Sequence, residues 1–563
     1  MANPAASTIS PARRDTPDLP WWKTTVIYQI YPRSFKDSNG DGIGDLRGII
    51  SKLNYFVYLG VETLWLSPFF TSPQADFGYD ISDYKDVDPI FGTMEDFREL
   101  VKQCKLRGLR ILLDFVCNHT SDRHEWFQKS LRKQGKYKDY YVWTDGKVLP
   151  DALFSYHQVS VFGGSAWEWC EERQQFYYHA FLAEQPDLNF RNPDVVEEMS
   201  LVMKYWLDLG VDGFRMDAVA NLFESEDIFQ DNPPSGKDVP PVSHWEYLKP
   251  VHNFYVLPEC RDLLVHWQNV LDKEKQIDGK ERFMVQEFYT DSDTRAAMAE
   301  YGAHAFNMDL VEELTVPLSA TQMMGLIAKE YTDRPESYWP TFVVGNHDKA
   351  RPATKYGPRY VDAFNMLLMT LKGTPTIYYG DELGMQDSSV AYEEAQDPFG
   401  IKIGPERYAL FGRDPCRTPM QWTSETQAGF TTSRKPWLPV GKDHEQRNVQ
   451  SQKKDEKSHL NLLKEYVALR SKDAFKYGDI GLDCVLNKNV LAFLRFFGSE
   501  RYLVAINFGQ ESSTDDHRGG PVAVATGTVV ANTGAVSDDL AKGRTIDLSS
   551  LTLRPGDGLV IQL

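Results

Sequence analysis

Cysteine is scarce in this sequence, and no two cysteines lie close together along the chain. Because no CxxC motif occurs, a zinc site held by cysteines is not expected. Single thiols can stay free in a reducing compartment or form a few long-range disulfides in an oxidising one, and the sequence leaves both open. The six residues are Cys104, Cys117, Cys170, Cys260, Cys416 and Cys484.

Long hydrophobic runs are also absent. No stretch of about 18 apolar residues occurs, so no integral membrane segment is predicted. Residues 1–20 are rich in Pro, Ala, Ser and Thr but lack the apolar core of a signal peptide, and we expect them to form a flexible N-terminal tail. The protein is therefore expected either to be cytoplasmic or to be a trimmed form of a secreted protein.

Basic residues are outnumbered by acidic ones. The chain has 61 Lys and Arg against 80 Asp and Glu, which gives a formal net charge of −19. This balance argues against nucleic acid and anionic membranes as partners. With 563 residues, 42% of them hydrophobic and 25% charged, the chain is expected to fold into several domains.

The sequence does contain eight short apolar runs that are mostly separated by helical stretches. The runs are rich in β-branched and aromatic residues and are apolar on both faces, as buried parallel strands are. Alternation with helices, such as those predicted at 94–107, 195–209 and 360–371, gives βα units. The pattern predicts an α/β fold, a (β/α)8 TIM barrel with its active site at the carboxyl ends of the strands. The runs are Val26–Tyr31, Val61–Leu66, Leu109–Phe115, Gly213–Met216, Phe283–Gln286, Ala305–Met308, Phe342–Val344 and Thr376–Tyr379.

Two intervals between these elements are too long for simple loops. Residues 120–186 hold many aromatics and glycines and predict a domain inserted after the third strand, and residues 387–442 predict a long insertion after the eighth. The barrel would then be built from residues 21–119 and 187–475. Short alternating strands in residues 476–563 predict a separate C-terminal antiparallel β-sandwich.

Polar residues gather where four of the predicted strands end. The four segments are Asp114–His119, Gly213–Ala218, Val285–Glu287 and Asn346–Asp348. Because the strand ends of a barrel meet at one face, the segments would bring three carboxylates, two histidines and an arginine together. An isolated aspartate at a strand end most often caps a helix. The joint occurrence of all four segments, in order, favours an active site instead.

Paired carboxylates at one site are typical of glycoside cleavage, in which one attacks the anomeric carbon and the other protonates the leaving oxygen. Arg215 lies two residues before Asp217 on the same strand, so both side chains point the same way and the guanidinium can keep Asp217 ionised. The apolar run before Glu287 favours a raised pKa and an acid role. Asp348 and the two histidines would form hydrogen bonds with sugar hydroxyls.

Together these segments resemble the signature regions of glycoside hydrolase family 13, the α-amylase family. Three further stretches are similar to its α-glucosidase and oligo-1,6-glucosidase branch, namely Gln185–Asn189, Asp76–Asp80 and Asp414–Trp422. The resemblance covers about residues 21–563. Within the branch the chain is most similar to the insect-type animal maltases and sucrases.

The resemblance assigns roles to individual residues. It implies that Asp217 is the nucleophile, Glu287 the acid/base and Asp348 the transition-state stabiliser of an exo-acting, retaining α-glucosidase. The catalytic carboxyl groups are then expected about 5–5.5 Å apart. Asp76 and Arg351 would block the end of the pocket by binding the terminal hydroxyls of the non-reducing glucose. The pocket residues that the resemblance implies are Asp76, Tyr79, His119, Arg215, His347 and Arg351.

Positions on the aglycone side leave the second sugar open. Ala218, after the predicted nucleophile, resembles the branch members that prefer α-1,4 over α-1,6 bonds, although a small residue suits packing there equally well. Asn221, Gln286 and the pair His157–Gln158 depart from the residues that are common at these positions in the family. Maltose, sucrose and longer malto-oligosaccharides all remain candidate substrates.

An acidic, glycine-rich loop at residues 37–45 follows the first predicted strand. Oxygen ligands recur at alternate positions, as in an EF-hand, but the final glutamate of an EF-hand is missing. In the family the matching loop binds calcium, so a structural Ca²⁺ is expected, and insect-type relatives suggest a second site formed by Asn118, Asp187 and Glu224. The ligands expected at the first site are Asp37, Asn39, Asp41, Asp45 and the carbonyl oxygen of Ile43.

Two other functions share these motifs. A transglucosylase or sucrose isomerase would use the same catalytic residues and pass the glucosyl group to a sugar instead of to water. The heavy chains of amino-acid transporters, which are non-catalytic, also resemble this branch, but they need a transmembrane helix before the barrel. The retained Asp217, Glu287 and Asp348 favour an enzyme whose partner is a small α-glucoside.

Overall fold

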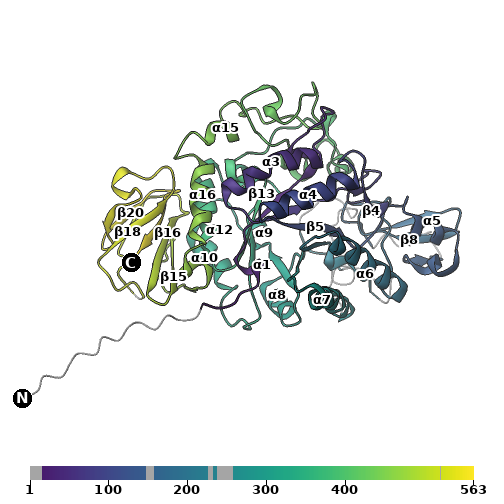
Figure 1. The fold of residues 1–563 in the computed structure, drawn as a ribbon, viewed down its shortest axis with the longest axis horizontal. Helices are drawn as coiled ribbons and strands as arrows, with labels where there is room; N and C mark the ends of the chain where they lie inside the picture. Colours follow the sequence, from purple (N-terminus) through teal and green to yellow (C-terminus); the bar gives the residue numbers. More distant parts are fainter. Residues whose placement is uncertain (1–15, 147–157, 226–232, 238–257, 520) are drawn as a thin grey trace, which may run out of the picture.

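Eight parallel strands close into a barrel at the centre of the molecule (Figure 1). The computed structural model describes residues 16–146, 158–225, 233–237, 258–519 and 521–563. Around the barrel the strand order is β1–β13–β12–β11–β10–β9–β5–β2. Every predicted strand is present, which confirms the (β/α)8 fold, while most of the predicted N-terminal tail lies outside the described residues. The strands are β1 (Ile27–Ile30), β2 (Thr63–Leu66), β5 (Arg110–Val116), β9 (Gly213–Asp217), β10 (Phe283–Gln286), β11 (His304–Asn307), β12 (Thr341–Val343) and β13 (Thr374–Tyr378).

Aromatic and aliphatic side chains fill the inside of the barrel. Helix α1 (Trp21–Thr24) precedes β1 and places Trp22 at the amino-terminal end, where it stacks on Phe283 with ring centroids 4.7 Å apart. Trp65 of β2 stacks on Phe306 of β11 at 5.4 Å. These rings belong to one buried cluster with residues of β1, β5, β10 and β12. The packed interior leaves the carboxyl ends of the strands as the place for a site.

Several of the helices around the barrel begin directly after residues whose side chains cap them. Helix α4 (Met94–Leu106) opens with a capping box, in which the side chains of Thr93 and Asp96 each accept the other's backbone N–H. The other two helices named from the sequence are α6 (Pro193–Asp208) and α12 (Val361–Thr370). None of the helices in the described ranges combines the length and apolar character needed to cross a membrane. Other helices are α2 (Pro32–Phe35), α3 (Leu46–Leu59), α7 (Pro258–Asp278), α8 (Ser292–Ala299), α9 (Asp309–Glu312), α10 (Ala320–Ala328), α11 (Pro352–Lys355), α14 (Tyr408–Phe411), α15 (Val449–Gln452), α16 (His459–Leu469) and α17 (Asp473–Lys476).

A small lobe is inserted between β5 and α6, within the interval 120–186 that the sequence set apart (Figure 1). Its antiparallel sheet has the strand order β6–β8–β7. Helix α5 packs on this sheet, with the rings of Phe127 and Tyr177 5.2 Å apart. An isolated bridge between His119 and Asp187 ties the lobe to the end of β5. The elements of the lobe are α5 (Glu125–Leu131), β6 (Trp143–Thr144), β7 (Trp167–Cys170) and β8 (Gln175–Tyr178).

The C-terminal part of the chain is an antiparallel β domain, as predicted. A six-stranded sheet with the order β14–β15–β16–β21–β18–β19 faces the pair β17–β20. Aliphatic side chains from both sheets form a separate buried cluster. The domain lies beside α12 and α16, at the opposite end of the molecule from the inserted lobe (Figure 1). Its strands are β14 (Asp479–Gly481), β15 (Val490–Phe497), β16 (Glu500–Asn507), β17 (Ser513–Asp515), β18 (Thr526–Asn532), β19 (Thr545–Asp547), β20 (Leu551–Leu553) and β21 (Gly558–Gln562).

All six cysteines are free thiols, and five of them are buried. The long-range disulfides that the sequence left open are therefore not formed. Burial raises the pKa of Cys104 and of Cys260 to about 12. Because a thiol reacts as its thiolate, these two side chains act as small apolar groups near neutral pH.

Candidate active site

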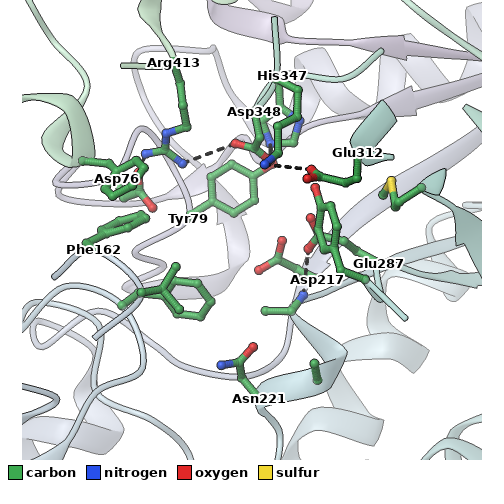
Figure 2. Close-up of a pocket in the computed structure, with 18 of the residues that line it drawn as sticks. Asp76, Tyr79, Phe162, Asp217, Asn221, Glu287, Glu312, His347, Asp348 and Arg413 are labelled. Atoms are coloured by element: carbon green, nitrogen blue, oxygen red, sulfur yellow. Dashed lines mark hydrogen bonds and ion pairs between the residues drawn. The ribbon is translucent and has the colours of Figure 1, made fainter. Parts of the chain in front are cut away.

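A pocket of about 640 Å³ opens at the carboxyl ends of the barrel strands, where the barrel meets the inserted lobe (Figure 2). One half of the pocket, the buried half, is enclosed by buried side chains. The other half, the outer half, carries a mixture of aromatic and charged side chains. The structure brings seven of the nine predicted catalytic and substrate-binding residues to the wall of this pocket. They are Asp76, Tyr79, His119, Asp217, Glu287, His347 and Asp348.

The predicted nucleophile, Asp217, ends strand β9 and is held by a buried guanidinium. Arg215, two residues earlier on the strand and 1% exposed, hydrogen-bonds Asp217. Its Nη1 also donates to Asp114 Oδ1 at 2.8 Å, and its Nη2 lies 3.0 Å from Glu287 Oε1. Arg215 thus lies behind the pocket wall, where one guanidinium orients three carboxyl groups.

The close approach of β9 and β10 places Glu287 beside Asp217. A Cβ at Gly213 would lie 1.9 Å from the carbonyl oxygen of Phe283, so only glycine allows the two strands to lie this close. Directly after Asp217, Ala218 adopts a left-handed φ of 50°. Its N–H donates to Glu287 Oε2 at 3.0 Å. This turn therefore fixes the predicted acid relative to the predicted nucleophile.

Burial controls the protonation of this carboxyl group cluster. Removal from water raises the pKa of Asp217 and of Glu287 to about 7, although Arg215 opposes the shift. Burial likewise raises the pKa of Asp114 to about 6. Three carboxyl groups around one guanidinium cannot all ionise without strong repulsion, so the cluster keeps a proton near neutral pH. A nucleophile and a proton donor are thereby available together.

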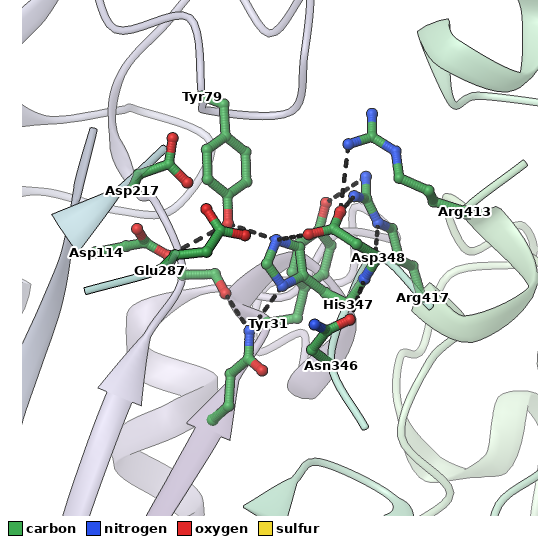
Figure 3. A network of polar contacts seen from close by, with 12 residues as sticks. Tyr31, Tyr79, Asp114, Asp217, Glu287, Asn346, His347, Asp348, Arg413 and Arg417 are labelled. Atoms are coloured by element: carbon green, nitrogen blue, oxygen red, sulfur yellow. Dashed lines mark hydrogen bonds and ion pairs between the residues drawn. The ribbon is translucent and has the colours of Figure 1, made fainter. Parts of the chain in front are cut away.

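Asp348, the third predicted catalytic residue, has the opposite electrostatic setting (Figure 3). Arg417 Nη2 lies 2.8 Å and Arg413 Nη1 3.3 Å from Asp348 Oδ1. Although burial opposes ionisation, these guanidinium groups hold the pKa of Asp348 below its usual range. Asp348 therefore stays ionised at pH values where the neighbouring cluster still holds its proton.

An ion pair between Asp76 and Arg413 forms one side of the buried half of the pocket (Figure 2). Arg413 Nη2 lies 2.9 Å from Asp76 Oδ1 and 2.7 Å from Asp397 Oδ1. Arg351, which was expected to block the end of the pocket together with Asp76, does not line the pocket. Arg351 is fully buried outside the pocket wall, and its Nη1 pairs with Asp381 Oδ1 at 3.0 Å. Arg413, which the sequence reasoning missed, takes its place.

Substitutions of the two arginines distinguish their roles. We expect Arg413→Met to lower kcat/KM for maltose by roughly 30-fold or more, because truncating one partner of a buried ion pair costs about 2–5 kcal/mol. The matched variant Arg351→Met removes the guanidinium that pairs with Asp381, and it should lower the melting temperature and not kcat/KM. Steady-state kinetics and thermal unfolding of both variants check this. A larger loss of kcat/KM in Arg351→Met would contradict the assignment.

Gln185 joins the inserted lobe to the buried half of the pocket. Its Nε2 lies 3.1 Å from His119 Nε2 and 3.3 Å from Asp76 Oδ2. His119 Nε2 also approaches the carbonyl oxygen of Tyr79 at 3.1 Å. Burial lowers the pKa of His119 to about 4, so the ring is neutral. Gln185 was not predicted as a site residue, although the motif that contains it was recognised.

The outer half of the pocket includes residues of the two long intervals that the sequence set apart, although none of these residues was predicted as a site residue. Phe162 of the inserted lobe stacks on Phe399 with ring centroids 5.2 Å apart. Phe399 belongs to α13 (Pro398–Ile403) in the long insertion that follows β13. Lys349 Nζ pairs with Glu312 Oε1 at 2.7 Å, which joins the loops after β12 and β11. A sugar beyond the first would meet these aromatic and charged groups.

The positions expected on the aglycone side fall in different places. Ala218 and Asn221 line the pocket. Gln286 does not, because it is fully buried on β10, where neither polar atom of its side chain has a described hydrogen-bond partner. Gln158 is buried and hydrogen-bonded within the inserted lobe, and His157 lies outside the described residues.

The predicted calcium loop, residues 37–45, is ordered by its own hydrogen bonds. Three backbone N–H groups of the loop donate to Asp37 at 2.7–2.9 Å, and that of Ile43 donates to Asp41 at 2.8 Å. Asp45 caps helix α3. Across the described ranges, no three His, Cys, Asp or Glu side chains meet as a metal cluster. The loop nevertheless offers only oxygen donors, which is the chemistry that Ca²⁺ prefers.

Asn118, Asp187 and Glu224, the second predicted calcium ligands, do come together. Asn118 Nδ2 donates to Asp187 Oδ2 at 2.9 Å. Burial and the nearby charge of Glu224 raise the pKa of Asp187 well above its usual range. Asn118 Oδ1 and Glu224 Oε1 are buried without a hydrogen-bond partner among the described residues. Buried oxygen atoms that lack a hydrogen-bond partner and lie beside a carboxylate are ligands of the kind that a divalent cation binds.

Known proteins resemble this chain over nearly its whole length. Residues 29–478 match the family model of the α-amylase catalytic domain. The chain is 42% identical to Maltase 1 of Drosophila virilis, over 97% of this chain and 87% of that protein. It is 41% identical to a salivary alpha-glucosidase of Aedes aegypti, over 88% of this chain and 87% of that protein. The solved structure of an alpha-glucosyl transfer enzyme has a TM-score of 0.86 and 36% identity, and the match covers 97% of this chain and 100% of that one.

Proposed function

The chain belongs to the α-amylase family of glycoside hydrolases and is an α-glucosidase, and we propose that it removes single glucose units from the non-reducing end of its substrate with retention of configuration. Maltose-, sucrose- and malto-oligosaccharide-type α-glucosides are the candidate substrates. The observation that carries the proposal is the buried half of the pocket, where Asp217 and Glu287 share Arg215 while the pair of Asp76 and Arg413 forms the wall.

The first chemical step follows from the protonation of the carboxyl cluster. A carboxylate oxygen of Asp217 attacks C1 of the glucose and forms an ester bond while the bond from C1 to the aglycone oxygen breaks. Glu287 gives its proton to that oxygen, so the aglycone leaves as a neutral alcohol. In the second step Glu287 takes a proton from water, whose oxygen attacks C1 and releases glucose with its original configuration.

The remaining pocket residues hold the glucose ring during these steps. Asp348, kept ionised by Arg413 and Arg417, is suited to accept hydrogen bonds from ring hydroxyls and to favour positive charge that develops at C1. His347, neutral and buried, is suited to donate to a hydroxyl. The pair of Asp76 and Arg413 would bind the terminal hydroxyls and stop a longer chain from passing through. This closure makes the predicted action exo.

A transglucosylase or sucrose isomerase would share the first step and differ in the second. There a sugar hydroxyl would take the glucosyl group instead of water, so the outer half of the pocket would have to hold that sugar. Phe162, Phe399 and the pair of Glu312 and Lys349 are the groups that such an acceptor would contact. Products larger than the substrate, formed at high maltose concentration, would identify this activity.

Release of glucose from maltose, sucrose and isomaltose tests the proposed function. We expect glucose from maltose or sucrose, and from a labelled malto-oligosaccharide we expect products shortened by one unit at a time. Products that are shorter by several units at once would contradict exo action. A folded protein that releases no glucose from any of these substrates would favour the alternative function, a non-catalytic protein that resembles the heavy chains of amino-acid transporters.

We also propose that structural Ca²⁺ binds at two places, the loop of residues 37–45 and the cluster of Asn118, Asp187 and Glu224. The oxygen-only donor set supports the first site, and the orphaned buried acceptors Asn118 Oδ1 and Glu224 Oε1 support the second. At either place the ion would neutralise carboxylates and tie segments together, and no chemical step requires it.

Calcium should therefore stabilise the protein. At a free concentration about 100 times its dissociation constant, Ca²⁺ is expected to add about 2.7 kcal/mol per site to the free energy of unfolding. The melting temperature in calcium against EDTA measures this. Asp41→Ala and Glu224→Gln should each remove part of the shift, because each belongs to one site only. Equal melting temperatures in calcium and EDTA would contradict the proposal.

A further inference from the structure

A hydrogen-bonded chain runs beneath the buried half of the pocket, from the barrel wall toward the nucleophile. Gln29 of β1 is 0% exposed and places its Nε2 2.9 Å from Nδ1 of His347. His347 Nε2 lies 2.6 Å from the hydroxyl of Tyr79, which donates to Asp114 Oδ2 at 3.2 Å (Figure 3). Asp114 in turn binds Arg215, the guanidinium that orients the nucleophile.

The direction of this chain follows from the chemistry of its members. Burial lowers the pKa of His347 to about 3, so the ring is neutral and carries one N–H. Its Nε2 also faces Asp348 Oδ2 at 3.4 Å, and an ionised carboxylate can only accept a hydrogen bond. The contact with Asp348 therefore favours the N–H on Nε2, which leaves Nδ1 to accept. The amide nitrogen of Gln29 is the donor that Nδ1 meets.

We propose that Gln29 is a positioning residue that fixes the tautomer of His347 and thereby the direction of the hydrogen bonds that run from His347 to Tyr79 and Asp114 at the pocket wall. With its N–H on Nε2, His347 donates to the hydroxyl oxygen of Tyr79, and the hydroxyl proton of Tyr79 turns to Asp114. The opposite tautomer would set a lone pair of Nε2 against the carboxylate of Asp348. The Tyr79 hydroxyl would then have to donate to Nε2, and Asp114 would lose its hydrogen bond from Tyr79.

The sheet itself holds Gln29 in place. In the barrel register Gln29 lies opposite Trp65 on one side and Tyr378 on the other. Its Nε2 also lies 3.3 Å from Ser67 Oγ, which restricts the side chain further. Gln29 is not part of the pocket wall, and of its two side-chain partners, His347 and Ser67, only His347 lines the pocket.

A double-mutant cycle on Gln29 and His347 tests the catalytic consequence, which rests on the proposed function. Gln29→Leu keeps the volume and removes the donor, and we expect kcat/KM for maltose to fall roughly tenfold to a hundredfold. In the His347→Ala background the same change should alter kcat/KM by less than about threefold, because its partner is gone. Equal losses in both backgrounds, or no loss in Gln29→Leu, would overturn the proposal.

Thr376→Val is the matched control. Thr376 lies on the neighbouring strand β13, is 1% exposed, and its hydroxyl has no described hydrogen-bond partner. Removing this hydroxyl changes a buried polar group of the same barrel without touching His347, and kcat/KM should stay unchanged. A loss as large as that of Gln29→Leu would mean that any disturbance of the barrel interior has this effect, which would overturn the proposal.

The tautomer of His347 can be measured without any catalytic assay. A failure of the proposal about Gln29 can therefore be distinguished from a failure of the proposed function. In the full-length protein labelled with ¹⁵N-histidine, the NMR signals lost in His347→Ala identify this ring. We expect the Nε2–H form in the unmodified protein and a loss of that preference in Gln29→Leu. An Nδ1–H form in the unmodified protein would overturn the proposal, whereas a protein inactive on every glucoside would overturn the proposed function instead.

Discussion

Replacing Asp217 by asparagine should abolish nearly all glucose release. The amide cannot form the ester with C1, and the loss of a covalent nucleophile typically lowers kcat on the order of 10⁴- to 10⁶-fold. Asp217→Asn keeps the size of the side chain and its position beside Arg215, so binding of maltose should change little. Glucose release measured over hours with purified protein checks this.

Chemical rescue and a control on the same strand make the result specific. In Asp217→Ala, azide can enter the vacated space and attack C1 from the same face, which should yield β-glucosyl azide. Asp212→Asn makes the same isosteric change at the opposite end of β9, where Asp212 accepts the N–H of Ile111 at 2.9 Å, and should leave kcat nearly unchanged. An Asp217→Asn protein that keeps more than a few per cent of activity would show that another group attacks.

Glu287→Gln should lower kcat for maltose by about 10²- to 10⁴-fold, the usual contribution of a general acid. The loss should depend on the leaving group. Fluoride leaves without a proton, so the variant should release one equivalent of fluoride rapidly from α-glucosyl fluoride and then stall, because no base activates water for the second step. A rapid-quench measurement of fluoride checks this, with Glu281→Gln at the opposite end of β10 as the control.

The pH profile should change with the same substitution. Because the pKa of Glu287 is raised to about 7, the unmodified enzyme loses its acid as the pH rises through that value, and kcat/KM for maltose should fall. Glutamine has no proton to lose, so the fluoride burst of Glu287→Gln should not fall over the same range. An alkaline limb that persists in this burst would assign the titration to a group other than Glu287.

The carboxylates proposed to be catalytic could be placed at the strand ends from the sequence because each follows an apolar run. A strand that is buried on both faces needs a nearly continuous apolar sequence, and the acidic residue that ends the run reaches the open end of the barrel. Asp217 ends β9 in this way, and Glu287 directly follows β10. Their proposed roles came from the resemblance to a known family, since spacing alone does not separate a nucleophile from an acid.

Arg413 could not be paired with Asp76 from the sequence. The two residues are 337 positions apart, and they meet only because the loop after β13 folds back over the loop after β2. The family resemblance pointed to Arg351, which follows Asp348 closely in the sequence. Local spacing tells which side chains share a strand end, but it does not tell which way a loop side chain turns. Arg351 turns away to Asp381.

Gln29 carried no functional signal in the sequence. A single polar residue inside an apolar strand is usually satisfied locally, and nothing in its surroundings distinguishes it from such a residue. Its partner His347 is 318 positions away, and the contact requires the curvature of the closed barrel. Interactions of this kind become visible only when the hydrogen-bond partners of a buried side chain are known.

Identifying the residue that carries the covalent intermediate tests the account most directly. 5-Fluoro-α-glucosyl fluoride should form the glucosyl-enzyme while slowing its hydrolysis, so that digestion and mass spectrometry can locate the adduct. The account predicts one adduct, on the peptide that contains Asp217, and none in Asp217→Asn. An adduct on Glu287 or Asp348, or a protein that releases glucose from maltose with inverted configuration, would contradict it.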